Sequence, residues 1–269
     1  MSESLVSYER RGRVALIGLN RESKRNALSF ELQALLKAAC RRAYEEASVA
    51  ILFGHGEHFC AGLDLQEAAV WMTDPELKYK KLVMDSPRPF EEMSNSPIPF
   101  IAAITGACIG GGLEIATACH IRVADDTSFF ALPEGQRGIY IGGGGSVRIA
   151  RLLGLGRMMD LMLTGRVLSA EEAERYNLIQ YRVARGQPLE HALSLAAKVA
   201  ENPPMTNWAI TNGLPRIQAF SQDDGLFVEG LLTGMVSGSH SAQRLNDFVN
   251  KRSKPIQRPD SDAVSPGKP

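Results

Sequence analysis

The stretch FIAAITGACIGGGLE, residues 100–114, decides the fold of this chain and carries its clearest chemical signal. Its first part, Phe100–Thr105, is a short apolar run typical of a strand buried on both faces of a mostly parallel sheet. The glycines at 110–112 then lead into a helix, whose first free N–H groups suit an anion or a developing oxyanion. Glu114 lies about one turn into that helix, where a carboxylate either interacts with the helix dipole in solvent or points into a cleft.

The three glycines alone allow other interpretations. They can form a tight packing turn, because glycine lets other groups approach the backbone closely. A nucleotide-phosphate loop is disfavoured, since no Lys-Ser or Lys-Thr pair follows at the required spacing.

Two further apolar runs, Arg13–Asn20 and Val49–Phe53, resemble buried strands. Between them, residues 30–47 carry leucines and alanines at helical spacing, and Ser29 is a good N-cap for that helix. Short apolar runs alternating with helical stretches predict an α/β fold with a mostly parallel sheet.

The later part of the chain becomes helical. Residues Ser169–Glu172 form a capping-box pattern, whose short helix should end near Asn177, before a strand at Leu178–Val183. After Gln187, apolar residues recur at helical spacing, and the last residues are rich in Pro, Ser and charge. We therefore expect an α/β core at 1–187, a helical C-terminal region at 188–251 and a disordered tail at 252–269.

A second small-residue turn, Phe59–Leu65, follows the Val49–Phe53 run and again leads into a helix. The N–H of Leu63 is a candidate second donor, and two donors from two turns are the minimum for an oxyanion hole. Asp64 fits the role of an N-terminal helix partner better than that of a catalyst.

A third segment supplies another carboxylate. Glu134 follows Pro133 in an apolar context, where burial would raise its pKa and prepare it for proton transfer near neutral pH. Taken alone, Glu134 fits a surface glutamate in a loop better than a catalytic group. The four glycines at 142–145 then bring the backbone close to another group and begin a helix that runs from Val147 to Leu153.

Together these segments resemble the crotonase superfamily, the enoyl-CoA hydratase/isomerase family, over about Leu5 to Val183. The resemblance implies a core of repeated ββα units in a spiral, with a helical C-terminal trimerisation region. It also implies that Leu63 and Gly111 supply the oxyanion hole and that Glu114 and Glu134 are the catalytic glutamates. The substrate-binding positions that it implies are Lys24, Arg25, Ala27, Ala61, Asp64, Leu65, Gly112 and Gly142.

The implied reaction is hydration of a 2-enoyl-CoA to the 3-hydroxyacyl-CoA, which is lyase chemistry of fatty acid metabolism. An enoyl-CoA isomerase, an acyl-CoA hydrolase, a carbon–carbon lyase and a catalytically silent CoA-binding member remain alternatives. The residues Tyr140 and Ile141 lie in a stretch that differs from the usual hydratase sequence, and they would reshape the acyl pocket. The resemblance further implies a homotrimer or a dimer of trimers, and no cofactor, because coenzyme A is part of the substrate. Lys251 and Arg252 are additional candidates for contacts with its phosphates.

The composition favours an enzyme acting on a small molecule. Lys plus Arg and Asp plus Glu number 30 each among 269 residues, so no global charge attracts nucleic acid or a membrane surface. Without a signal-peptide core or a membrane span, we expect a cytoplasmic protein. The four cysteines should be reduced and buried. His55 and His58 have no third ligand nearby, so no metal is expected, and His120 should be structural.

Overall fold

The computed structural model describes residues 4–76 and 89–252 of the chain. The chain forms two compact units, Met1–Arg216 and Ile217–Pro269. No helix within those described ranges is both long and apolar enough to cross a membrane.

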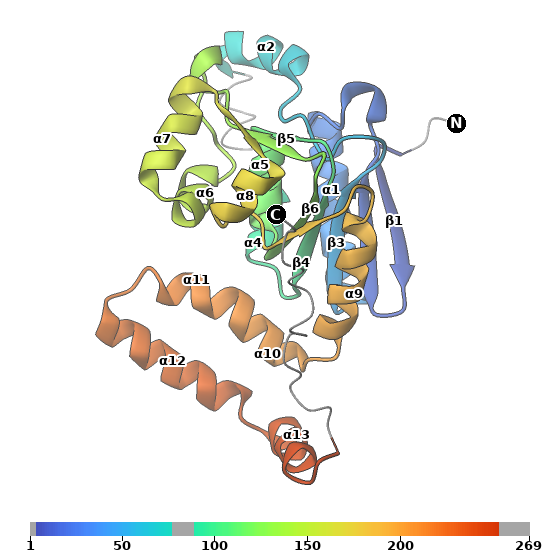
Figure 1. Ribbon diagram of the computed structural model, residues 1–269, viewed down its shortest axis with the longest axis vertical. Helices are drawn as coiled ribbons and strands as arrows, with labels where there is room; N and C mark the ends of the chain where they lie inside the picture. Colours follow the sequence, from blue (N-terminus) through green and yellow to red (C-terminus); the bar gives the residue numbers. More distant parts are fainter. Residues whose placement is uncertain (1–3, 77–88, 253–269) are drawn as a thin grey trace, which may run out of the picture. The chain divides into compact units, whose positions relative to one another are not determined.

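The first unit is built on a six-stranded sheet (Figure 1). In spatial order its strands are β1 (Val6–Arg11), β2 (Val14–Leu19), β3 (Val49–Gly54), β4 (Phe100–Ile104), β6 (Ile121–Asp125) and β9 (Tyr181–Val183). The pair β1–β2 is antiparallel, and every other neighbouring pair is parallel. This arrangement confirms the predicted α/β class and the strands predicted from the apolar runs.

A second, three-stranded sheet consists of β5 (Ala107–Ile109), β7 (Phe129–Ala131) and β8 (Val167–Ser169). The chain passes from β4 into β5, and from β6 into β7, after short turns. The helix α5 (Gly111–Ala118) follows the first strand pair, so strand–strand–helix units repeat along the chain as predicted.

Two helices cover opposite faces of the larger sheet. The helix α1 (Phe30–Glu46) begins after Ser29, whose hydroxyl accepts a hydrogen bond from the amide of Leu32, and packs on residues such as Ile17 and Leu52. The helix α9 (Pro188–Ala200) packs its alanine face on the alternate residues, including Leu16. Since successive residues of a strand point to opposite faces, both faces of these strands are apolar and buried.

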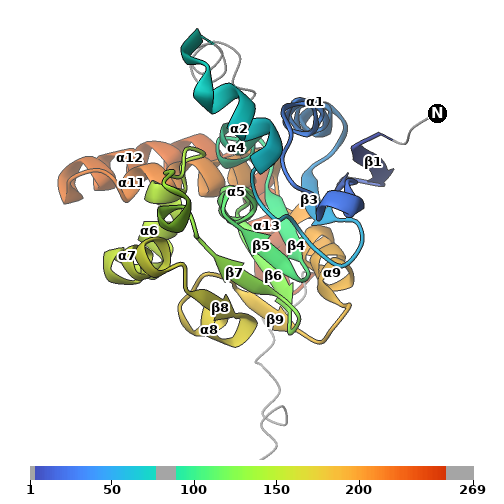
Figure 2. The ribbon, with the colours of Figure 1, turned by 90° about the horizontal axis from the view of Figure 1, so that it is seen from above.

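Of the remaining helices of the first unit, α4 and α6 pack on α5, and Figure 2 shows α5 with α4, α6 and β5 around it. These remaining helices are η1 (Glu22–Lys24), α2 (Leu65–Thr73), α4 (Pro89–Ser94), η3 (Gly135–Arg137), α6 (Gly145–Leu153), α7 (Leu155–Thr164), α8 (Ala170–Arg175), α10 (Pro204–Trp208) and the π-helix η4 (Ala209–Gly213). The last residue of α11 (Leu214–Ile217) is the first residue of the second unit, which also contains α12 (Gln222–Val236) and α13 (Ser239–Val249).

The details after α8 differ partly from the sequence prediction. The capping box at Ser169 is confirmed, and Asn177 adopts the expected left-handed conformation with a φ of 61°. The predicted strand at Leu178–Val183 is wrong in its first half, because the amides of Leu178 and Ile179 both donate to the carbonyl of Ala173. Only Tyr181–Val183 pairs with β6.

The C-terminal part is helical from α9 to α13 among the described residues, as the sequence pattern indicated. The compact units, however, divide between Arg216 and Ile217, and α9 belongs to the core of the first unit. The tail predicted beyond Arg252 lies outside the described residues.

The first turn of α5 packs tightly against the segment before α2. Cys60 and Cys108 form an isolated parallel bridge, which ties that segment to β5. A Cβ atom on Gly112 would lie 2.4 Å from the carbonyl oxygen of Cys60 and 2.9 Å from its Cβ. Only glycine therefore fits at this position without a backbone shift.

We predict that Gly112→Ala lowers the free energy of unfolding by about 1–3 kcal/mol, the usual effect of overpacking a close contact. Urea unfolding measures this change. The matched control is Gly156→Ala in α7, where a Cβ would meet no atom within 4 Å, so its stability should be unchanged or slightly raised. Equal stabilities of the two variants would contradict the packing argument.

Candidate active site

Two backbone amides lie close together at the start of α5. Leu63 forms an isolated parallel bridge with Leu28, in which the amide of Leu28 donates to Gly62 O at 2.8 Å and the amide of Asp64 donates to Leu28 O at 3.1 Å. Because the residues on either side of Leu63 make these bonds, its own N–H points away from Leu28. A Cβ built on Gly111 would lie 3.6 Å from the nitrogen of Leu63, so the two amides are neighbours.

Neither of these amides donates a backbone hydrogen bond within the part of the chain that the structure describes. Gly111 is the first residue of α5, where an N–H group has no partner inside the helix. Two unpaired donors from separate loops can therefore bind one oxygen atom, which is the requirement for an oxyanion hole.

Glu114 lies in the first turn of α5 and is 4% exposed. Its Oε1 accepts hydrogen bonds from the amides of Gly143 at 2.8 Å and Gly145 at 2.9 Å. Burial raises the pKa of this carboxyl, while these amides, the charge of Arg148 and the amide of Gly142 oppose the rise. Glu114 is thus a desolvated carboxyl whose pKa stays above its ordinary value, although fixed donors oppose the rise.

Arg148 holds the glycine loop that binds Glu114. Its guanidinium donates a short hydrogen bond to the carbonyl of Gly143 and a longer one, at 3.5 Å, to the carbonyl of Glu114. A Cβ on Gly144 would collide with the same guanidinium, which explains the glycine there.

Glu134 stands on the loop after β7 and is 6% exposed. A Cβ on Gly110 would lie 2.7 Å from its Oε1, so the carboxyl rests against the glycine that precedes the amide of Gly111. Its Oε2 is buried and has no hydrogen-bond partner among the described residues. Burial raises the pKa of Glu134, and the nearby charge of Glu114 raises it further, whereas its own amide and Arg137 lower it.

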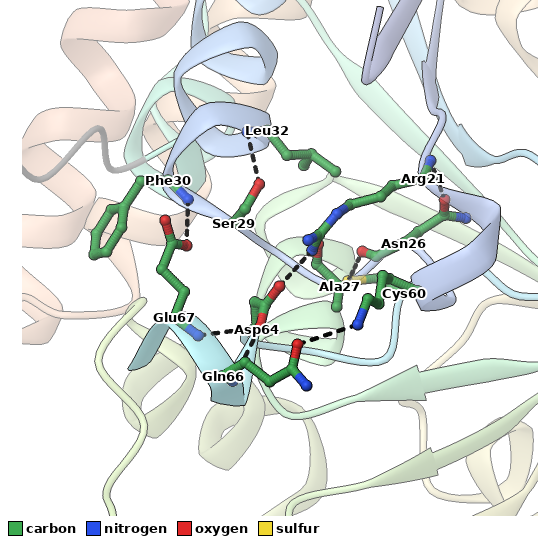
Figure 3. Close-up of polar contacts among 11 residues, drawn as sticks. Arg21, Asn26, Ala27, Ser29, Phe30, Leu32, Cys60, Asp64, Gln66 and Glu67 are labelled. Carbon is green, nitrogen blue, oxygen red and sulfur yellow. Dashed lines mark hydrogen bonds and ion pairs between the residues drawn. The ribbon is translucent and has the colours of Figure 1, made fainter. Parts of the chain in front are cut away.

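The segment Asn20–Leu28 lies along the loop that carries Leu63 (Figure 3). Arg25 adopts a left-handed conformation with a φ of 50°, and its carbonyl accepts from the amide of Ala61 at 2.9 Å. Lys24 is exposed, and its Nζ donates to Gln66 Oε1 at 3.1 Å.

Both carboxylate oxygens of Asp64 accept hydrogen bonds from other groups of the protein. Its Oδ1 accepts from the amides of Gln66 and Glu67 at the start of α2, as expected of an N-cap. Its Oδ2 accepts from Arg21 Nη1 at 2.7 Å, and the same nitrogen donates to the carbonyl of Ala27 at 3.0 Å.

The structure brings most of the predicted site residues together. Leu63, Gly111, Gly112, Glu114 and Glu134 surround the first turn of α5, and Gly142 contributes its amide near Glu114. The other predicted positions lie along the neighbouring loop: Lys24, Arg25, Ala27, Ala61, Asp64 and the exposed Leu65. Lys251 and Arg252 follow α13 in the second unit.

Sequence reasoning assigned no individual role to Arg21, Asn26 or Arg148, although Arg21 and Asn26 lie in the Asn20–Leu28 segment, which resembles the coenzyme A-binding entry of the family. Asn26 is fully buried, accepts from the amide of Arg21 at 2.8 Å and donates to the carbonyls of His55 and His58. Arg25 and Asn26 both adopt a left-handed backbone conformation. The only sequence feature that indicated it is the asparagine itself, because asparagine tolerates that conformation.

The histidines and cysteines have structural roles. His55 shares a hydrogen bond with Ser7 Oγ at 2.7 Å, His58 Nδ1 accepts from the amide of Ala107, and His120 Nδ1 accepts from the amide of Phe100. In residues 4–76 and 89–252 no group of three His, Cys, Asp or Glu side chains is arranged to hold a metal ion. All four cysteines are buried and unbridged, as predicted.

A mostly apolar cavity of about 350 Å³ lies between the loop after Glu134 and α7. Its lining includes Tyr140, Met158, Met159 and Met162. Tyr140 is 72% exposed, whereas Ile141 is buried, so of these two residues only Tyr140 faces the cavity.

The sheet of repeated strand–strand–helix units and the paired amides beside two buried glutamates define a known class of acyl-thioester proteins. Residues 9–253 match the family model described as enoyl-CoA hydratase/isomerase, and the chain belongs to this family.

Individual relatives agree over most of their length. The chain is 38% identical over 256 residues to a probable enoyl-CoA hydratase of Rhizobium meliloti, covering 94% of this chain and 97% of the relative. It is also similar to the crystal structure of an enoyl-CoA hydratase from Bacillus anthracis, with 32% identity, a TM-score of 0.84 and coverage of 92% and 96%. A structure from Rhodopseudomonas palustris matches at 40% identity and a TM-score of 0.83, covering 93% and 96%.

We predict that Glu134→Gln raises the free energy of unfolding at about pH 8, by about 1 kcal/mol, as stabilising changes at strained functional sites often do. The folded-state pKa of Glu134 lies above its ordinary value. Its stabilising contribution is therefore complete below the unfolded-state pKa and is lost as the pH rises through the folded-state pKa. The gain from the substitution should shrink towards about pH 4.

Urea unfolding of both proteins across this pH range measures the difference. The control is Glu31→Gln, which removes an exposed carboxylate from the first turn of α1 and should slightly destabilise the protein at high pH. A Glu134→Gln variant less stable than wild type at about pH 8 would show that burial does not strain this carboxylate.

Proposed function

We propose that this protein hydrates a 2-enoyl-CoA thioester to the corresponding 3-hydroxyacyl-CoA. The observation that carries the proposal is the contrast between two buried glutamates beside unpaired amides. Glu114 Oε1 accepts two backbone hydrogen bonds, whereas Glu134 Oε2 finds no partner in the described chain. Membership of the enoyl-CoA hydratase/isomerase family supports the same reaction.

The thioester carbonyl oxygen binds between the N–H groups of Leu63 and Gly111. Negative charge grows on this oxygen as water adds to the double bond and an enolate forms. Donors already aimed at that position stabilise the enolate without reorganisation, and removing one such donor typically reduces the rate about 10²–10³-fold.

Glu114 acts as the base toward water, and Glu134 protonates the α-carbon. The water loses a proton to Glu114 and forms the C–O bond at the β-carbon, while the π electrons move toward the thioester. The α-carbon then takes a proton from Glu134, and a proton passing from Glu114 to Glu134 restores the starting state. The backbone amides around Glu114 oppose the rise of its pKa, while burial and the charge of Glu114 both favour the protonated form of Glu134.

The substrate carries its own coenzyme A, so the proposed reaction uses no separate cofactor and no metal. Lys24 and Arg25, both exposed at the edge of the site, bind the phosphates. The backbone of Ala27, Ala61, Asp64 and Leu65 lines the path to the oxyanion hole, while Gly112 and Gly142 lie beside the acyl carbons and the water.

We predict that crotonyl-CoA loses its conjugated absorbance when the wild-type protein is added. Glu114→Gln and Glu134→Gln should each lower kcat by about 10²–10⁴, since each removes one proton-transfer group. Their KM should change little, because neither carboxylate is needed for the coenzyme A contacts.

The matched control is Glu171→Gln, which alters an exposed carboxylate in the first turn of α8 and should keep full activity. Turnover of a 3-enoyl-CoA without turnover of any 2-enoyl-CoA would reject the hydratase and favour the isomerase. Full activity in Glu134→Gln would show that the proton at the α-carbon comes from another group.

The active form is proposed to be a homotrimer or a dimer of trimers. Large apolar side chains are exposed on α12 and α13, and such surfaces usually mark protein interfaces. They are Leu226, Phe227, Leu231, Met235, Leu245, Phe248 and Val249.

Light scattering should therefore give three or six times the chain mass of 29.3 kDa. Phe227→Asp should shift the particle toward smaller species, because it places a charge on that apolar surface. A monomeric wild-type protein would contradict the assembly.

A further inference from the structure

Arg21 connects two segments that are far apart in sequence. Its Nη1 donates to Asp64 Oδ2 at 2.7 Å and to the carbonyl of Ala27 at 3.0 Å. The two side chains of this ion pair are 20% and 10% exposed, so water screens their attraction less than it screens a surface pair. Figure 3 shows the guanidinium reaching across from the Asn20–Leu28 segment to the start of α2.

The backbone of Arg21 is fixed as well. Its amide donates to Asn26 Oδ1 at 2.8 Å, and Asn26 Nδ2 donates to the carbonyls of His55 and His58 at 3.0 and 2.8 Å. The backbone of Arg21 is thereby anchored to the loop that follows β3, so the point from which its side chain extends is fixed.

Asp64 receives this contact one residue after Leu63. Its amide donates to the carbonyl of Leu28, and its other carboxylate oxygen caps α2. The peptide that follows Leu63 is therefore held from two sides, by the Leu28 bridge and by the ion pair with Arg21.

We propose that Arg21 and Asp64 are positioning residues, whose ion pair keeps the N–H of Leu63 directed at the same point as the N–H of Gly111. This inference rests on the proposed function, because it assigns a task to the oxyanion hole. Neither side chain touches the reacting atoms. Placement of a donor matters for catalysis because a productive geometry tolerates errors of only about 0.5 Å.

The ion pair is one of several contacts between the two segments. The bridge between Leu28 and Leu63, and the hydrogen bond from the amide of Phe30 to Glu67 Oε2 at 2.8 Å, also join these segments. Loss of the ion pair should therefore leave a folded protein in which the Leu63 amide is less well oriented.

The experiment compares crotonyl-CoA hydration by full-length wild type, Arg21→Met, Arg21→Lys, Asp64→Asn and the double variant Arg21→Met/Asp64→Asn. Arg21→Met should lower kcat about tenfold, less than complete loss of a donor would, and change KM by less than about twofold. Arg21→Lys should recover part of kcat, because an ammonium keeps the positive charge opposite Asp64 but lacks the rigid planar group that places Nη1 between Asp64 and the carbonyl of Ala27. The double variant should be faster than the product of the two single effects would give, because both substitutions remove the same ion pair, and this difference measures the coupling.

The matched control is the exposed ion pair of Arg182 with Asp126, whose atoms lie 2.8 Å apart. Arg182→Met should leave kcat unchanged. Thermal unfolding of every variant ensures that rates are compared where the proteins are folded. If Arg21→Met does not fold, Asp64→Asn decides the question, because its side-chain oxygen can still cap α2.

The positioning role is overturned if folded Arg21→Met and Asp64→Asn keep the wild-type kcat, or if only KM changes, which would make Arg21 a binding residue. A wild-type protein that turns over only a 3-enoyl-CoA would reject the hydratase proposal alone. The same variants tested on that substrate would still decide the role of Arg21, because an enolate forms in both reactions. Absence of turnover with every enoyl-CoA would overturn both.

Discussion

The close packing of glycine backbone at the start of α5 is the constraint on which the site depends. Gly110 has a φ of 53° and Gly62 a φ of 93°, and a Cβ on Gly62 would lie 2.7 Å from the carbonyl of Ile109. Gly112 is equally confined by Cys60. These contacts bring the two loops so close together that their free N–H groups can bind one oxygen atom. A residue with a Cβ atom at these glycine positions would not fit at this distance.

The same loops give the two glutamates different surroundings. Glu114 is enclosed by amides from a loop that Arg148 holds in place, so its charge is compensated although it is buried. Glu134 is buried as well, but its second carboxylate oxygen has no such donors among the described residues. Burial raises the pKa of both carboxyls; backbone amides oppose the rise at Glu114, whereas the charge of Glu114 adds to it at Glu134.

Much of this was predictable from local patterns. The strands β2, β3 and β4 are continuous apolar runs, and such runs occur where both faces of a sheet are covered. The N-cap at Ser29 and the capping box at Ser169 depend only on residues three positions apart. The resemblance to a known family then selected the candidate site residues, because glycines and glutamates have no distinctive pattern alone.

The parts that sequence reasoning missed depend on long-range contacts. Arg21 donates a hydrogen bond to Asp64, which lies 43 positions away in the sequence, and Arg148 donates one to Glu114, which lies 34 positions away. In a sequence, an arginine is normally interpreted as a solvated surface charge, and only the folded chain shows the buried partners of Arg21 and Arg148. The late start of β9 has a local cause instead, because the carbonyl of Ala173 accepts hydrogen bonds from the amides of Leu178 and Ile179, which would otherwise belong to the strand.

The buried thiols have a practical consequence for spectroscopy. Burial raises the pKa of Cys60 and of Cys119 to about 12, and it also raises the pKa values of Cys40 and Cys108. Since the thiolate is the reactive species, maleimide dyes should not react with any of the four native cysteines while the protein stays folded. A single cysteine introduced on the surface would then accept one fluorophore at a chosen point, without first removing any thiol from the interior.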